Sequence, residues 1–218
     1  MAKPFRVFGI GLNKTGTSTL RAALRKLGYR HFGHSAALVR AYARRDWAAI
    51  FEVADAHESF EDWPWPLVWR QMHERYGEDA RFILTRRHTP EAWLASLKAH
   101  AERAHPGGFA RRIAYGWDYP HGREAEHLEV YARHLDGIRN YFAHPARRHL
   151  MAEFCWEEGD GWRELCRFLG ERRRRGPFPH VNASAQAQPD PRHLAANRER
   201  IAQQLASISR RAPGSGSR

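Results

Sequence analysis

The chain has 218 residues, 42% of them hydrophobic, which is enough for one hydrophobic core and does not require a second. Its formal net charge of +12 at pH 7 predicts affinity for nucleic acid, anionic membranes or anionic small ligands, although the scattered arginines could equally reflect a compositional bias. The two cysteines exclude a disulfide framework and a cysteine-based zinc site, so a reducing cytoplasm is expected. The first ten residues predict a strand, neither a signal peptide nor a membrane anchor.

Residues 5–20 predict a buried strand that runs through a glycine turn into a helix. The apolar run stops at Gly11, and Ser18 opens a segment with leucines at helical spacing. Such a turn points the first helical N–H groups at a ligand, for which a phosphate or sulfate is the natural choice. Lys14 adds a positive charge, and hydroxyl donors stand at Thr15, Thr17, Ser18 and Thr19. The alternative is a glycine-rich turn that binds no ligand.

This loop differs in one position from the usual triphosphate-binding loop, GxxxxGK[ST], in which the lysine follows the second glycine. Gly11 and Gly16 have that spacing, but Thr17 stands where the lysine should be, and Lys14 lies inside the loop. The segment Lys-Thr-Gly-Thr-Ser instead resembles the 5′-phosphosulfate loop of the sulfotransferases, whose usual form is Lys-Ser-Gly-Thr-Thr. The resemblance implies 3′-phosphoadenosine 5′-phosphosulfate (PAPS) as sulfuryl donor, without a metal. Lys14 would reach the sulfuryl group, and the 5′-phosphate would contact Thr15, Gly16, Thr17 and Ser18. Thr19 is also expected among the residues that bind the donor.

The next segments carry no strong chemical signature. A short strand is expected within 29–34, followed by a helix that Ser35 caps and that extends to about Ala43. His31 and His34 are three positions apart, as two metal ligands on a helix would be. No carboxylate or cysteine accompanies them closely, so we expect no metal site.

Residues 59–66, SFEDWPWP, place two carboxylates on a connection between a strand and a helix, and the prolines exclude a helix before Leu67. Such connections carry ligand sites in parallel α/β sheets. A bacterial branch of sulfotransferase-like proteins has a similar aspartate before an aromatic-proline turn. That resemblance implies that Asp62 is the general base, with His57 and Glu61 as alternates, although many cytosolic sulfotransferases use a histidine. Alternatively, Asp62 caps the turn or pairs with an arginine.

Residues 80–85, ARFILT, predict the clearest buried strand, and Arg86 and Arg87 follow it directly. A helix starts at Thr89 or Pro90 and presents Ser96. The segment resembles the one with which sulfotransferases hold the 3′-phosphate of the donor, through an arginine after the strand and a serine on the helix. The usual separation is eight residues, and Arg87 lies nine before Ser96, so Arg87 is favoured and Arg86 is the alternate. A solvated pair of arginines is the other interpretation.

The remaining chain predicts a loop over 105–122, a core helix over 124–142, a last parallel strand over 150–155 and a helix over 161–169. Trp117 and Tyr119 in the loop either line an acceptor pocket or pack onto the domain. Trp156 matches a family segment near the adenine and is a candidate for base stacking. The arginine run 172–175 contacts the 3′-phosphate of the donor or a polyanion, or it is simply solvated.

Strands and helices that alternate with short connections predict an α/β three-layer domain with a central parallel sheet, and the resemblance implies the P-loop NTPase-like sulfotransferase fold. We expect this domain over 1–183. Residues 184–218 should form a polar extension, with a linker over 184–191, a helix over 192–209 and a disordered end from 211.

The function that follows is transfer of a sulfuryl group from PAPS to a hydroxyl or amine of a small-molecule acceptor, with no nucleic-acid or membrane partner. Lys14 and Asp62 would be catalytic. One alternative is a nucleotide-dependent kinase or hydrolase, against which the missing lysine after Gly16 counts. Another is a polyanion- or RNA-binding protein, which the net charge favours but which lacks the interleaved basic and aromatic residues of single-strand binding.

Overall fold

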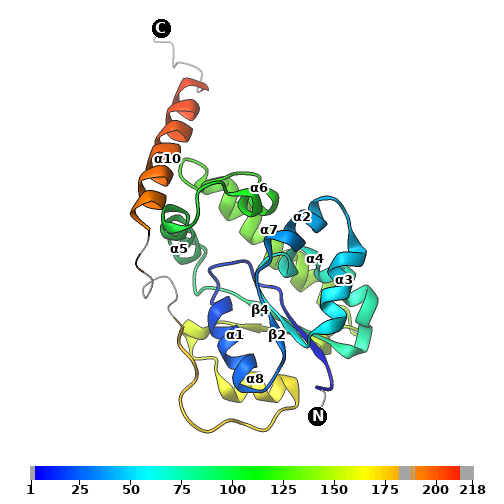
Figure 1. Ribbon diagram of the computed structural model, residues 1–218. Coiled ribbons are helices and arrows are strands. Elements are labelled where there is room, and N and C mark those ends of the chain that lie inside the picture. The colour runs from blue at the N-terminus through cyan, green and yellow to red at the C-terminus, as the bar shows by residue number, and fades with distance from the viewer. Residues whose placement is uncertain (1–2, 182–187, 189, 212–218) are drawn as a thin grey trace.

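The computed structural model describes residues 3–181, 188 and 190–211. Within them, one sheet of five parallel strands lies between two layers of helices (Figure 1), which confirms the predicted α/β architecture. The spatial order is β2-β3-β1-β4-β5, so β1 is central. The strands are β1 (Arg6–Gly9), β2 (His31–Phe32), β3 (Ser59–Phe60), β4 (Ala80–Thr85) and β5 (Met151–Phe154).

The described residues form nine α-helices, of which α10 packs on α5 and not on the sheet. In chain order they are α1 (Thr17–Lys26), α2 (Ala36–Ala43), α3 (Trp47–Ala56), α4 (Trp65–Tyr76), α5 (Pro90–Arg103), α6 (Phe109–Tyr115), α7 (Glu124–Phe142), α8 (Trp162–Leu169) and α10 (Pro191–Arg211).

Alternation along the strands divides the core into two parts. Val7 and Ile83 face α1 and α8, whereas Phe8, Phe82 and Leu84 face the layer that contains α4 and α7. Successive side chains of a strand point to opposite faces, so a continuous apolar run is expected when both faces are covered. The carboxyl ends of β1, β3 and β4 therefore meet at one edge, where the loop after β1 lies.

Two local predictions were wrong, and one helix was missed. Helix α4 begins at Trp65 and not at Leu67, because Pro66 stands in its first turn, where the missing N–H costs no helical hydrogen bond. Helix α3 was not predicted, although Asp46 caps it by accepting from the Ala49 N–H at 3.2 Å. The segment 105–122 was expected to be a loop, but it contains α6.

Helix α10 packs along α5 (Figure 1). The contact is centred on Asn197, whose side chain is fully buried. Its Nδ2 donates to the carbonyls of Glu102 at 2.9 Å and Ala104 at 2.7 Å, and its Oδ1 accepts from the Tyr119 hydroxyl at 2.7 Å. The end of α5 is thus held by the C-terminal helix. The predicted linker and chain end fall largely outside the described residues.

Candidate active site

The loop between β1 and α1 has a conformation that its glycines make possible. Gly16 precedes α1 with φ of 95°, and a Cβ at this position would lie 2.4 Å from Cδ1 of Trp156. A Cβ on Gly11 would lie 2.2 Å from the Thr85 hydroxyl. Neither position has room for a side chain, so the backbone approaches β4 and Trp156 closely. The loop therefore curls over the start of α1, as an anion-binding turn requires.

Hydrogen bonds of Thr15 in the loop and of Thr19 in the first turn of α1 join this region to distant segments. The Thr15 hydroxyl donates to the Leu12 carbonyl at 2.6 Å and shares a hydrogen bond with the Thr85 hydroxyl at 2.7 Å. The Thr19 hydroxyl accepts from the Val181 N–H at 3.2 Å. Trp156 supports the loop from the other side, since its indole N–H donates to the Gly16 carbonyl at 3.2 Å.

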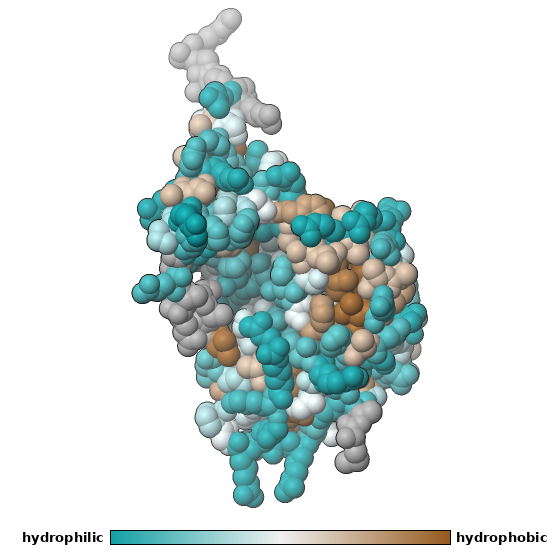
Figure 2. All heavy atoms as spheres, in the orientation of Figure 1, coloured by the Kyte–Doolittle hydropathy of each residue, from teal (hydrophilic) through white to brown (hydrophobic). Residues whose placement is uncertain are grey.

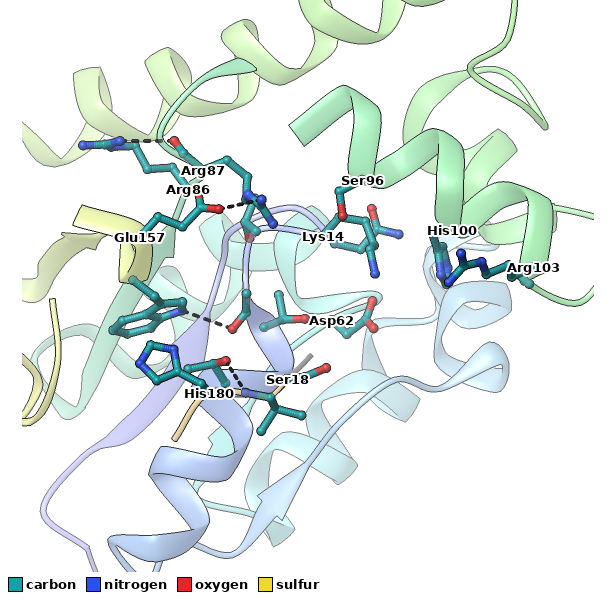
Figure 3. Close-up of a pocket in the computed structure, with 18 of the residues that line it drawn as sticks. Lys14, Ser18, Asp62, Arg86, Arg87, Ser96, His100, Arg103, Glu157 and His180 are labelled. Carbon is teal, nitrogen blue, oxygen red and sulfur yellow. Dashed lines mark hydrogen bonds and ion pairs between the residues drawn. The ribbon is translucent and has the colours of Figure 1, made fainter. Parts of the chain in front are cut away.

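A cavity of about 790 Å³ opens above this loop (Figure 3). Figure 2 shows that mostly hydrophilic atoms surround the recess between α1 and α5. Every residue predicted for the site contributes to the cavity wall: Lys14, Thr15, Gly16, Thr17, Ser18, Thr19, Asp62, Arg87 and Ser96. The volume lies within the range of about 300–1,000 Å³ that small-molecule sites occupy. Residues that follow β1, β3 and β4, together with Ser96 of α5, are therefore brought to one cavity as the sequence predicted.

The two consecutive arginines have different surroundings. The Nε of Arg86 lies 2.7 Å from Glu153 Oε1, and its Nη2 lies 2.6 Å from Glu158 Oε2. Arg87 forms an ion pair with Glu157, with 2.5 Å between Nη2 and Oε1. In Figure 3 the Arg87 guanidinium points toward Lys14 and that of Arg86 points away. Arg87 is thus better placed to meet a ligand.

Of the three candidate bases, Asp62 lies in the cavity wall and the two alternates do not. His57 bonds to the Val53 carbonyl at 2.9 Å, and Glu61 is 1% exposed behind the cavity. Asp62 has φ of 63°, and its Oδ1 accepts from the Trp63 N–H at 2.8 Å. Its carboxylate therefore does bind the following turn, as the alternative interpretation predicted, while it faces the cavity.

Burial raises the pKa of Asp62, and the negative charge of Glu61 raises it further. Burial lowers the pKa of Lys14, an effect that Asp62 opposes and that Arg87 and Arg103 reinforce. The cavity therefore places a carboxylate of increased basicity near an ammonium of increased acidity. Such opposite shifts are typical of groups that exchange protons with a ligand.

Sequence reasoning missed His100 and Arg103, which line the cavity from α5. Burial, with Lys14 and Arg111 nearby, lowers the pKa of His100 to about 4, so its ring is neutral at pH 7. The signal was present in the spacing, because Ser96, His100 and Arg103 are four and three positions apart and share one face of the helix. Other wall residues that were not predicted are Asn13, Ala104, Glu157, His180, Val181, Gln188 and Asp190.

Trp117 and Tyr119, the candidates for an acceptor pocket, are not part of the cavity wall. Trp117 is 37% exposed and lies under the Arg123 guanidinium, 4.1 Å from ring centroid to Cζ. Tyr119 is buried against α10. Trp156 does line the cavity, stacked on Phe154 with 5.3 Å between centroids. The arginines 172–175 line a separate hollow beside Leu27 and Glu171.

Among the described residues, no group of three or more His, Cys, Asp or Glu side chains could hold a metal ion. His31 instead bonds through Nδ1 to the Ser59 hydroxyl at 2.9 Å. Within the residues that the structure describes, no helix is long and apolar enough to cross a bilayer.

Comparison with known proteins identifies a protein family and solved structures of similar fold. A family model described as a sulfotransferase domain matches residues 6–118 and 108–187. The crystal structure of a sulfotransferase from Alicyclobacillus acidocaldarius has a similar fold, with a TM-score of 0.51 and 18% sequence identity. The alignment covers 97% of this chain and 100% of that one. The search of curated proteins finds no match.

Proposed function

Because the chain belongs to the sulfotransferase family, we propose that it transfers a sulfuryl group from PAPS to a hydroxyl or amine of a small-molecule acceptor. The observation that carries this proposal is the position of Lys14. It lies inside the anion-binding turn, in the wall of a cavity that also contains Asp62, Arg87 and Ser96. The positive charge of Lys14 inside the turn is placed to contact the sulfuryl group that the bound donor carries next to its 5′-phosphate.

The residues around the loop fit a donor with two separated anionic groups. The start of α1 has no acidic residue in its first turn. The Thr19 N–H donates to the Gly16 carbonyl at 3.0 Å, so the N–H groups of Thr17 and Ser18 are the ones that this helix start can offer to an anion. Ser18 is half-buried at this end and lines the cavity. Arg87 and Ser96 provide a second set of donors for the 3′-phosphate. The Trp156 ring stands in the wall near both sets, where it would meet the adenine.

PAPS would supply a sulfuryl group on an activated anhydride. Asp62 accepts the proton of the acceptor hydroxyl as the acceptor oxygen bonds to sulfur. The bond from sulfur to the phosphate oxygen breaks, and Lys14 stabilises the charge that this oxygen acquires. The products are the sulfated acceptor, 3′-phosphoadenosine 5′-phosphate (PAP) and protonated Asp62. The stabilisation is electrostatic, as it is in phosphoryl transfer.

His100 is the other titratable group close to Lys14, but it is a weaker candidate for the base. Its pKa of about 4 reflects burial and nearby positive charge, whereas the pKa of Asp62 is raised. A general base works best when its pKa approaches the working pH, and the shift of Asp62 is in that direction. Asp62 is therefore the proposed base.

Calorimetry with three ligands tests the proposal. PAP should bind, and ATP with magnesium and a single-stranded oligonucleotide should bind far more weakly. Tight binding of ATP with magnesium would favour a kinase or hydrolase instead, and tight binding of the oligonucleotide would favour a polyanion-binding protein. We also propose a cytoplasmic location, since both cysteines are buried and unpaired.

A further inference from the structure

One polar side chain of the cavity wall has no role in the contacts proposed above. Asn13 comes directly before Lys14 in the loop and lines the cavity. It is 7% exposed, so its amide is a largely buried polar group. Buried amides in proteins are hydrogen-bonded, and an asparagine side chain can both accept and donate. Asn13 has a partner for only one of these two functions among the described residues.

Two aromatic residues hold Asn13 in place. The Trp93 indole N–H donates to the Asn13 carbonyl at 3.0 Å, and the Tyr115 hydroxyl donates to Asn13 Oδ1. Burial, together with the negative charge of Asp62, raises the pKa of Tyr115 well above its usual value. The hydroxyl therefore keeps its proton at neutral pH and continues to donate it to Oδ1. Because the amide oxygen faces Tyr115, the amide nitrogen faces away from it.

The amide nitrogen of Asn13 remains for a ligand. Within the part of the chain that the structure describes, Nδ2 makes no hydrogen bond to a protein atom. The buried polar atoms that lack a partner in that part do not include it, so Nδ2 is open to the cavity. An amide nitrogen donates and does not accept. The wall therefore presents a fixed, neutral hydrogen-bond donor to whatever binds there.

Asp62 presents the complementary group nearby. Its Oδ1 accepts from the Trp63 N–H at 2.8 Å, which leaves Oδ2 for the acceptor proton. The Tyr115 ring packs edge-on against Trp63, with 5.7 Å between ring centroids, so the supports of Asn13 and Asp62 are in contact. In Figure 3 the Asp62 side chain points into the cavity near Lys14, the residue that follows Asn13. A donor and an acceptor of hydrogen bonds thus lie in the same part of the wall.

We propose that Asn13 selects a hydroxyl acceptor over an amine, because its Nδ2 donates to the acceptor oxygen while Asp62 takes the proton of that oxygen. This inference rests on the proposed function. A hydroxyl oxygen has two lone pairs, so one can bond to sulfur while the other accepts from Asn13. A neutral amine nitrogen has a single lone pair, which the new bond to sulfur takes up. Nδ2 would then lose its partner, which should lower the rate with an amine by about 10- to 100-fold.

Asn13 exchanges no proton in this step. The acceptor oxygen gives its proton to Asp62 Oδ2 and forms the bond to sulfur. The electron pair of the broken bond between sulfur and oxygen stays on the phosphate of PAP. The hydrogen bond from Nδ2 orients the acceptor oxygen so that its other lone pair points at sulfur, and such alignment lowers the barrier. The substrate class that follows is an alcohol or a phenol.

Matched compounds test the inference in the full chain saturated with PAP. Phenol is compared with aniline, and 2-naphthol with 2-naphthylamine. Both members of each pair are neutral at pH 7 and similar in shape, but the lone pair of an arylamine is delocalised into the ring and accepts poorly. In calorimetry we expect each hydroxyl compound to bind about tenfold more tightly than its amine, the effect of one hydrogen bond to a buried donor.

Two further measurements follow the reacting group itself. In NMR spectra, the side-chain N–H signals of Asn13, identified by their loss in Asn13→Asp, should move downfield with phenol and stay nearly in place with aniline. With PAPS, 4-aminophenol offers both groups in one molecule, and its product should be the O-sulfate.

Substitutions locate the preference. Asn13→Asp keeps the shape of the side chain and can still accept from the Tyr115 hydroxyl, but its second oxygen accepts where Nδ2 donated. The ratio of phenol affinity to aniline affinity should fall at least about tenfold in this variant. Tyr115→Phe leaves the amide free to rotate and should lower the ratio in part. Asn140→Asp makes the same chemical change at an exposed position of α7 and should leave the ratio unchanged. Thermal unfolding checks the fold of each variant.

The outcomes separate this inference from the proposed function. Failure of PAP to bind would overturn both. Normal PAP binding with equal affinities within the pairs, or the N-sulfate as the product from 4-aminophenol, would overturn the inference alone. A ratio that Asn13→Asp and Tyr115→Phe both left unchanged would also overturn it. So would a fall in PAP affinity in Asn13→Asp as large as the fall in the ratio, because Asn13 would then belong to the donor site.

Discussion

The Arg87 guanidinium and the Glu157 carboxylate form an ion pair in the cavity wall, with 2.5 Å between Nη2 and Oε1. Glu157 also accepts from the N–H of His88 at 3.0 Å, so a neighbouring backbone group holds it in place. A donor phosphate would have to compete with Glu157 for Arg87. We therefore expect Glu157→Gln to bind PAP several-fold more tightly than the wild type, measured by calorimetry. Weaker binding in this variant would mean that Glu157 itself contacts the nucleotide.

Arg87→Ala should weaken PAP binding by about 10- to 100-fold, since hydrogen bonds to charged groups contribute about 1.5–3 kcal/mol. Adenosine 5′-phosphate lacks the 3′-phosphate and should lose much less affinity. Arg86→Ala is the matched control, because Glu153 and Glu158 hold that guanidinium. A larger loss in Arg86→Ala would assign the 3′-phosphate to Arg86.

Lys14→Ala should reduce kcat by about 10²–10³, the effect of removing one group that stabilises developing charge in a transition state. The fold should persist, as judged by circular dichroism and thermal unfolding, because the side chain faces the cavity. Lys26→Ala, at the exposed end of α1, is the control and should retain full activity. Activity that survived in Lys14→Ala would remove the proposed mechanism.

Asp62→Asn should reduce kcat by about 10²–10⁴, the usual contribution of a general base, with little change in PAP affinity. In the wild type the carboxylate must be ionised to accept a proton. Activity should therefore fall as the pH drops through the pKa of Asp62, which burial and Glu61 raise. A pH profile of kcat that kept its acid limb in Asp62→Asn would assign the limb to another group.

Glu61→Gln tests whether the buried neighbour adjusts the base. Glu61 Oε1 lies 3.5 Å from Arg21 Nη1 and 3.6 Å from His31 Nε2. Removal of its negative charge should lower the pKa of Asp62, because a nearby anion disfavours a second one. The acid limb of the kcat profile should then move to lower pH, with thermal unfolding as the check on folding. A limb that stayed in place would mean that burial alone sets this pKa.

Much of the site was predictable because its residues lie next to strand ends. Lys14, Asp62 and Arg87 each follow a strand, and a parallel sheet brings such positions to one edge whatever the detailed packing. Ser96 was predictable from the helix after β4. The choice between Arg86 and Arg87 was not, because it depends on carboxylates of a distant segment, Glu153, Glu157 and Glu158.

Other features depend on contacts between residues that are far apart in the sequence, and no local sequence pattern indicates such contacts. The Thr15 hydroxyl looked available for an anion, but Thr85 of β4 engages it. Tyr119 lies in an aromatic segment that is typical of a ligand pocket, yet its hydroxyl donates to Asn197, 78 positions away in the sequence. Helix α3 was missed although its cap, Asp46, was visible in the sequence.

The hydrogen bonds from Asn197 to the end of α5 have a practical consequence for the screening of acceptors. A shortened version ending near residue 183 would retain the loop, Asp62 and Arg87, and it could therefore still turn over a sulfuryl donor. The last turn of α5 would fray once Asn197 was gone, and Arg103 would move with it. A compound library tested on the trimmed protein would then rank its hits by a selectivity that the whole enzyme does not have.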